Sequence, residues 1–205
     1  MGRMKLFTIP ASPFGRKVRV VAAEANIADR IEVTHADPWN STARLPDVNP
    51  IGKVPVLVVD VATVLYDSSV ICEYLDAVHG HNTLFPLDQD SRWTTLRRHS
   101  LADGTLEAFI AVRHERRRPP TEQSAGWIER QLNVVRRCLD AMDAEVPALH
   151  EEVTIAHVAF AVTLGHLDFR RANVETHWRD GRHSLTDWYA RFAERPSMRT
   201  TVPFE

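Results

Sequence analysis

Strand-forming sequence is confined to the N-terminal part of this chain, and that segregation limits the folds open to it. Two β-rich runs, residues 55–59 and 63–66, are separated by only three residues, which predicts a hairpin. Upstream, a strand over residues 5–9, an apolar helix face and a short strand at Ile31 and Val33 predict a βαβ unit, because parallel pairing needs a crossover of that length. We therefore expect βαβ followed by ββ.

Helical patterns dominate the rest of the sequence. Asp67 is a favourable N-cap ahead of an apolar series at helical spacing, and Gly80 is a natural stop for that helix. Farther on, apolar residues at helical spacing predict helices over about 127–142, 155–169 and 185–193, with no convincing strand signal beside them. The expected class is α/β plus all-α: a βαβ-ββα domain followed by a helical bundle.

The separation of the two patterns also predicts the domain boundaries. Strand and helix signals that segregate along a chain are typical of separate domains. We expect an α/β domain over residues 1–80 and an all-helical domain over residues 90–205.

Composition excludes several classes of function. Apolar residues make up 44% and charged residues 25%, and the net charge is -2, which argues against a nucleic-acid partner. No apolar run approaches the ~20 residues that span a bilayer, and the first residues lack a secretory signal, so we expect a cytoplasmic protein without a membrane partner. Cys72 and Cys138 lie far apart among apolar neighbours, and the histidines show no ligand spacing, so no metal site is expected.

The first candidate site is the turn Ser12-Pro13-Phe14-Gly15, between the first strand and the first helix. A dithiol oxidoreductase would carry Cys-Pro-x-Cys here. Without two sulfurs, the turn cannot cycle through an internal disulfide. A serine hydroxyl can instead donate a hydrogen bond to a thiolate that a ligand supplies.

A hydrogen bond from this serine can supply enough free energy to ionise a bound thiol. A free thiol with a pKa of ~8.5 is only about 3% thiolate at pH 7, and lowering the pKa by ~2 units requires about 2.7 kcal/mol. One charge-assisted hydrogen bond contributes ~1.5–3 kcal/mol, and a helix N-terminus adds ~0.3–1 kcal/mol. The alternative is that Ser12 only caps the helix, with Pro13 at its first position.

Two further elements can each be interpreted either as part of a ligand site or as ordinary local structure. Pro55 begins a strand and suits a cis bond, which would present the backbone of Val54 to a peptide ligand; an ordinary trans proline is the alternative. Asp67 and Ser68 open a helix, where backbone N–H groups and the serine hydroxyl can hold a carboxylate and the aspartate an ammonium group. Both residues are also ordinary helix caps.

A Ser-Pro turn, a Val-Pro strand start and an Asp-Ser helix start, in that order, resemble the cytosolic glutathione S-transferases. The likeness is to bacterial members with Ser-Pro-Phe near the N-terminus, and it covers essentially the whole chain. The resemblance implies a thioredoxin-like N-terminal domain, an all-helical second domain, glutathione as co-substrate and no metal. It also implies a homodimer, with contacts near Tyr74 and Arg97.

The resemblance also implies roles for individual residues. Ser12 would lie at the glutathione sulfur as the catalytic residue, with the neighbouring hydroxyl of Thr8 as an alternative partner. Residues expected to bind glutathione are Phe14, Lys53, Val54, Pro55, Asp67 and Ser68. In the helical half, Arg113 and Arg117 lie in a basic run that resembles one wall of the second-substrate site, although cations at a helix C-terminus also favour the dipole without any ligand.

One position departs from the family pattern. The family commonly starts its core helix with Ser/Thr-x-x-Asp, whereas this chain has Thr154-Ile155-Ala156-His157. The carboxylate that would accept from the cap N–H is missing, so we expect a less stable helix start or a local rearrangement.

The leading functional hypothesis is an enzyme that activates the glutathione thiol for attack on a small electrophile. A glutathione-dependent reductase or isomerase would use the same thiolate. A non-catalytic interaction module is the alternative from another class, because a fold alone does not fix a function.

Overall fold

The protein, a computed structural model in which residues 3–38, 45–149, 151–171 and 177–205 are described, divides into two compact units. The N-terminal unit comprises Met1–Asp88 together with Pro196–Glu205, and the helical unit comprises Gln89–Arg195. Sequence reasoning assigned residues 90–205 to the second domain. In the structure the segment 196–205 packs with the first unit, because its short helix α9 lies on α1.

The N-terminal unit is built on a four-stranded sheet in the order β2-β1-β3-β4. Strands β1 and β2 run parallel, whereas β3 is antiparallel to both β1 and β4. The strand bounds are β1 Met4–Thr8, β2 Ile31–His35, β3 Val56–Val58 and β4 Val64–Leu65. This is the predicted βαβ-ββ order.

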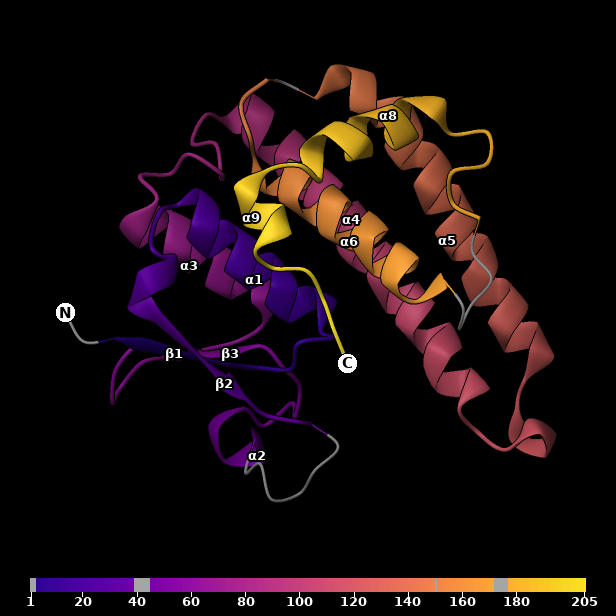
Figure 1. Cartoon of the computed structure of the whole chain (residues 1–205), viewed down its shortest axis with the longest axis horizontal. Helices are drawn as coiled ribbons and strands as arrows, with labels where there is room; N and C mark the ends of the chain where they lie inside the picture. Colours follow the sequence, from indigo (N-terminus) through magenta and orange to yellow (C-terminus); the bar gives the residue numbers. More distant parts are fainter. Residues whose placement is uncertain (1–2, 39–44, 150, 172–176) are drawn as a thin grey trace. The chain divides into compact units, whose positions relative to one another are not determined.

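The two faces of the sheet carry different helices (Figure 1). The helices α1 Pro13–Glu24 and α3 Ser68–His79 lie on one face, which agrees with the complete burial of Leu6 and Leu57. The short helix α2 Leu45–Val48 lies on the other, where Leu45 packs with Ala36 and Val56. Alternate residues of one strand thus fill two separate cores, as the pleat requires. A 3₁₀ turn, η1 Ala28–Arg30, connects α1 to β2.

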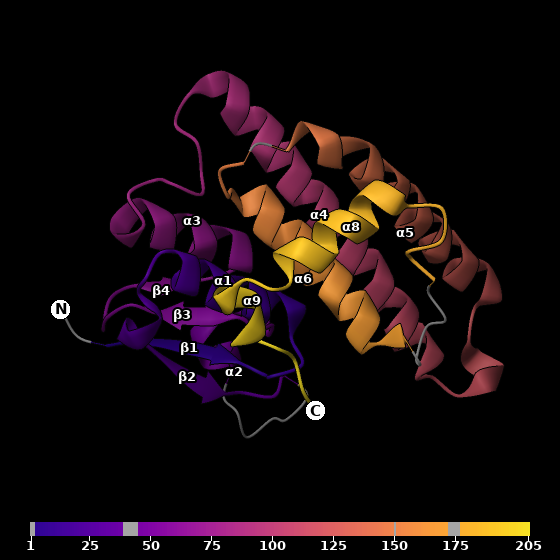
Figure 2. The same ribbon diagram turned by 45° about the horizontal axis from the view of Figure 1, so that its top comes forward.

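Helix α9, Pro196–Arg199, lies beside α1 (Figure 2). Polar contacts hold it there. The Arg16 guanidinium donates to the carbonyl of Met198 at 3.1 Å. The Ser197 hydroxyl donates to the Glu24 carboxylate at 2.5 Å. These contacts explain why the end of the chain belongs to the N-terminal unit.

The helical unit packs around α6, whose residues from Ile155 to Leu167 are all buried. Helix α4 packs against both α6 and α5, and α8 packs against α5 and α6. The bounds are α4 Gln89–Arg116, α5 Ala125–Glu145, α6 Ile155–Phe169 and α8 His183–Phe192, with 3₁₀ turns η3 Pro120–Glu122 and η4 Val146–Ala148. The predicted α/β plus all-α class is confirmed. Within the described ranges, no helix combines the length and the apolarity needed to cross a membrane.

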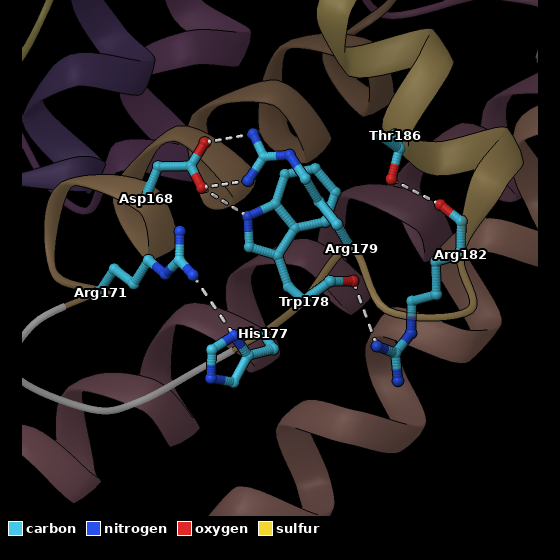
Figure 3. Close-up of polar contacts among 7 residues, drawn as sticks. All are labelled: Asp168, Arg171, His177, Trp178, Arg179, Arg182 and Thr186. Atoms are coloured by element: carbon cyan, nitrogen blue, oxygen red, sulfur yellow. Dashed lines mark hydrogen bonds and ion pairs between the residues drawn. The ribbon is translucent and has the colours of Figure 1, made fainter.

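The segment that leads into α8 is fixed by contacts to α6 (Figure 3), and the first turn of α8 is fixed by a contact to α5. The Asp168 carboxylate accepts from the Trp178 indole at 2.8 Å and from both terminal nitrogens of Arg179 at 2.6 and 2.7 Å. The guanidinium carbon of Arg179 lies 4.1 Å from the Trp178 ring centroid. Asp143 of α5 accepts from the backbone N–H of Leu185 at 2.8 Å, so a neighbouring helix caps α8.

The missing carboxylate at the start of α6 is replaced by an imidazole. The backbone N–H of Thr154 donates to Nδ1 of His157 at 3.0 Å. That bond requires an unprotonated Nδ1, so the ring is neutral with its proton on Nε2. The ring is buried and lies 6.2 Å, centroid to centroid, from both Trp188 and Phe192. The expected local rearrangement is therefore not needed.

Replacing His157 by alanine should lower the free energy of unfolding by about 2 kcal/mol, because a returned cap bond and aromatic packing are lost together. His157→Asp restores an acceptor and should lose less. Urea unfolding at neutral pH measures both variants. Equal losses in the two variants would show that the cap bond contributes nothing.

A second prediction concerns acid stability. Hydrogen bonds from Arg97 and Arg98 hold the pKa of Glu145 below its ordinary value of 4.5, and the Arg98 Nε lies 2.6 Å from the carboxylate. When folding lowers the pKa of a carboxyl group, its ionised form stabilises the folded state at pH values above the pKa of the unfolded state. This stabilisation is lost as the pH falls through the pKa of the folded state. Glu145→Gln should be less stable at pH 7, with the difference from wild type shrinking below about pH 4.5. Urea midpoints across pH test this, and a constant difference would contradict it.

Candidate functional site

The strand register brings the three predicted site elements to one end of the sheet. Ser12 follows the C-terminal end of β1, and Phe7 near that end pairs with Val56, the first residue of β3. Leu65, the last residue of β4, pairs with Leu57 of β3. The Val54-Pro55 step before β3 and the Asp67-Ser68 step after β4 therefore lie beside the end of β1 from which Ser12 follows.

Ser12 is buried at the N-terminus of α1 and caps it. Its Oγ accepts a hydrogen bond from the Gly15 backbone N–H at 3.1 Å. The capping interpretation is thus confirmed, but it uses only the acceptor side of the hydroxyl. The O–H remains a donor, so capping and thiolate contact are compatible.

Gly15 occupies the position that the second cysteine of a dithiol motif would take. A Cβ at this position would overlap the Thr8 hydroxyl and lie 2.9 Å from the Thr8 Cβ. The Thr8 side chain is buried, and its hydroxyl donates to the carbonyl of Ile9 at 3.4 Å. The close approach of β1 and α1 therefore leaves no room for a side chain.

Gly15→Ala should destabilise the protein by about 1–3 kcal/mol through this overlap. Thr8→Ala in the same chain removes the hydroxyl and methyl and should recover part of the loss. Gly126→Ala is the matched control, because a Cβ there meets nothing within 4 Å and should not destabilise. Thermal unfolding compares the four proteins, and a neutral Gly15→Ala would contradict the packing account.

Backbone polar groups are presented at the start of β3. The Val54-Pro55 bond is cis, as suggested by the sequence. The preceding loop is held by Asn49, whose amide donates to the carbonyl of Lys53 at 2.8 Å and accepts from Ile51 N–H at 3.0 Å. Among the described residues, none hydrogen-bonds the N–H or C=O of Val54. An extended peptide can pair with such a residue.

Asp67 and Ser68 form the N-terminus of α3. Asp67 is exposed and accepts from the Ser69 backbone N–H at 2.9 Å, whereas Ser68 is buried. Asp67 therefore acts as an N-cap, which is one of the two predicted interpretations. Its second carboxylate oxygen and exposure leave it able to meet an ammonium group.

The other predicted residues vary in exposure. Phe14 is half-buried and Lys53 is exposed. Arg113 is half-buried in the last turn of α4, and Arg117 is exposed just beyond that helix; their role towards a second substrate stays a prediction. The sequence analysis did not single out Lys17 as a neighbour of Phe14. Lys17 is fully buried, and its Nζ lies 5.7 Å from the Phe14 ring centroid. Its spacing three residues after Phe14 was the available signal.

No cluster of three potential metal-binding side chains occurs in the portion of the chain that the structure describes. Cys72 is buried and Cys138 half-buried, and these two cysteines form no disulfide.

Known proteins are similar to this chain in sequence and fold. The family model for the glutathione S-transferase N-terminal domain matches residues 11–78, and that for the C-terminal domain matches residues 125–191. The uncharacterized GST-like protein YibF of Escherichia coli (strain K12) is 30% identical over 203 residues, which cover 98% of each chain. This chain belongs to the glutathione S-transferase family.

Solved structures of other family members contain glutathione or a derivative. A transferase from Methylobacillus flagellatus KT with glutathione bound is 36% identical to this transferase-family chain, with a TM-score of 0.91 over 98% of this chain and 100% of that one. A family member from Pseudomonas fluorescens Pf-5 with bound S-(propanoic acid)-glutathione is 38% identical, with a TM-score of 0.87 and the same coverage.

Proposed function

We propose that this transferase-family protein binds glutathione in its N-terminal unit and activates the thiol for attack on a small electrophile. The observation that carries the proposal is the convergence at one end of the sheet of a capping serine, a Val54 backbone that no described residue hydrogen-bonds, and an acidic helix start. The glutathione bound in similar structures supports it.

The tripeptide is assigned to these elements by its chemistry. The cysteinyl backbone pairs with Val54 beside Pro55, in the manner of an added strand. The γ-glutamyl ammonium meets the exposed Asp67, and its carboxylate meets Ser68 and the N-terminus of α3. Lys53 is available to the glycyl carboxylate, and Phe14 contributes apolar contact.

Thiol activation is assigned to Ser12. Its O–H donates to the sulfur while its oxygen keeps the bond from Gly15, so the donor is already oriented by the cap. The N-terminus of α1 adds favourable electrostatics for the anion. The products then form by ordinary thiolate attack on the electrophile.

The second substrate is proposed to be anionic. Arg113 and Arg117 supply cations near the end of α4. The propanoic acid derivative of glutathione bound by the Pseudomonas relative supports this choice. Electrophiles matched in reactivity, one a carboxylate and one its amide, test it: the carboxylate should react faster, and Arg113→Gln should remove the preference.

Reduction and isomerisation use the same thiolate as conjugation, so the three reactions are distinguished by their products. Mass spectrometry of the reaction should show a glutathione conjugate. Glutathione disulfide together with a reduced substrate would indicate a reductase, and a rearranged substrate with unconsumed glutathione would indicate an isomerase.

Calorimetry separates these enzymes from a non-catalytic module. Glutathione should bind the protein, and Asp67→Ala should weaken that binding because the γ-glutamyl ammonium loses its partner. Failure to bind at about millimolar glutathione, equivalent to roughly -4 kcal/mol, would favour an interaction module.

Homodimer formation through α3 and the first part of α4 is part of the proposal. Val70 and Val78 on α3 are 49% and 50% exposed and flank Tyr74 at four-residue spacing, so one helix face is apolar. Light scattering should give twice the chain mass, and a monomer would oppose the assignment. Cytoplasmic location likewise stays a prediction.

A further inference from the structure

A ligand-sized cavity lies in the N-terminal unit, away from the end of the sheet that carries Ser12. It has a volume of about 250 Å³ and lies between the C-terminal half of α1, the edge strand β2 and the residues just after α9. Figure 2 shows α9 beside α1 on the helical face of the sheet. Apolar side chains line most of it, including Leu6, Ala22, Ala23 and Val33.

One charged group, the guanidinium of Arg19, lines this apolar cavity. Arg19 is half-buried, and burial lowers its pKa from the ordinary value. Within the described ranges its one hydrogen bond is long, 3.4 Å from Nη2 to the carbonyl of Thr200. Among the described residues, none offers Arg19 a carboxylate. A partly desolvated charge without a counter-ion is unfavourable, and an anion in the cavity would compensate it.

We propose that this cavity binds a monocarboxylate with a short apolar tail, with the carboxylate on Arg19 and the tail on Leu6, Ala23 and Val33. The site is distinct from the glutathione site and does not depend on the proposed function.

The cavity's size and lining select this ligand class. A cavity of about 150 Å³ holds benzene, so 250 Å³ accommodates a six-carbon chain or a single ring with its carboxylate. The planar guanidinium fork matches a carboxylate. A phosphate dianion would need more donors than this single arginine provides, since the hydroxyls of Thr200 and Thr201 already donate to carbonyls of their own segment.

The end of the chain does not fill the cavity. Beyond Thr201, Val202 and Phe204 are 58% and 59% exposed, and neither lines the cavity. Val33 on the edge strand is likewise 52% exposed, which leaves an apolar wall open to a ligand.

The test is calorimetry and ligand-observed NMR with hexanoate, hexanol and hexylamine on the full chain, in the presence of saturating glutathione. Hexanoate should bind saturably and at least about tenfold more tightly than the other two. Arg19→Gln should weaken hexanoate binding about tenfold or more, whereas Arg19→Lys should weaken it less. Ala23→Leu should abolish binding by filling the cavity.

Lys5→Gln is the matched control, because it removes one positive charge from an exposed position on the other face of β1 from Leu6. It should bind hexanoate as the wild type does. Thermal unfolding confirms that each variant is folded. Hexanol binding as tightly as hexanoate, unchanged binding by Arg19→Gln, or equal loss in Lys5→Gln would each overturn the proposal, as would displacement of hexanoate by glutathione.

Discussion

Ser12→Ala should lower kcat/KM at pH 7 by about 4- to 25-fold while leaving the Kd for glutathione within about a factor of three. One charge-assisted hydrogen bond contributes ~1.5–3 kcal/mol, so its loss raises the thiol pKa by about 1–2 units. The thiolate fraction at pH 7 then falls from roughly three quarters to between roughly 20% and 3%. Affinity changes little because Val54, Asp67 and Ser68 are assigned to the peptide and γ-glutamyl groups. The deficit should shrink above about pH 8.5, where the thiol ionises without help.

A stability control is needed for this variant, since Ser12 also caps α1 through Gly15 N–H. Losing the cap to alanine costs about 0.5–2 kcal/mol of stability, whereas glycine at an N-cap costs only a few tenths. Ser12→Gly should therefore lose as much activity as Ser12→Ala while remaining more stable. Normal activity in Ser12→Gly would show that the hydroxyl is not the thiolate partner and would direct attention to Thr8.

Asp76→Ala should lower the free energy of unfolding by about 3–6 kcal/mol, the largest loss expected for a side chain outside the site. The Asp76 carboxylate is fully buried in α3. It accepts from the backbone N–H groups of Thr83, Leu84 and Phe85 at 3.0, 3.1 and 2.8 Å. Truncation leaves these donors without their acceptor, and each buried unsatisfied donor costs about 1–3 kcal/mol.

Two further variants test whether the loss of stability comes from the buried carboxylate of Asp76. Asp76→Asn keeps one oxygen and should lose about half as much. Asp29→Ala removes an exposed carboxylate from the same unit and should change stability by less than about 0.5 kcal/mol. Urea unfolding measures all three. A loss for Asp76→Ala no larger than for Asp29→Ala would contradict the assigned role of the buried carboxylate.

The fold was predictable wherever local sequence and tertiary packing agree. The limits of α3 follow from Asp67 as N-cap and Gly80 as C-cap, and both lie where the sequence indicated. The bounds of α6 were also predicted, because most side chains of that helix are apolar and buried. A predominantly apolar run of that length indicates a buried helix, because buried strands are shorter.

The sequence did not reveal the whole of α4 or α9. Buried positions of α4 include Arg98, His99 and Thr105, which are polar and satisfied by partners, so an apolar stripe is not visible in the sequence. Helix α9 is too short for any periodic signal and is fixed by its contacts to α1. Only the folded chain supplies those partners.

In the candidate site too, local features were predictable from the sequence and features that depend on tertiary packing were not. The capping roles of Ser12 and Asp67 were among the predicted alternatives, because caps are local. The Thr8–Gly15 approach was not predicted, since it depends on how close two backbone segments come in space. The imidazole acceptor at His157 was not predicted because the residue that usually returns this cap bond is a Glu, Gln or Asp. The resemblance to the family was correct because its motifs mark those local turns.

The most direct test of the central proposal is the pKa of the glutathione thiol on the protein, followed by the ultraviolet absorbance of the thiolate as pH is raised. The account predicts that glutathione bound to the wild-type protein ionises about 2 units below the ~8.5 of a free thiol. A bound thiol that titrates at the free value would contradict it.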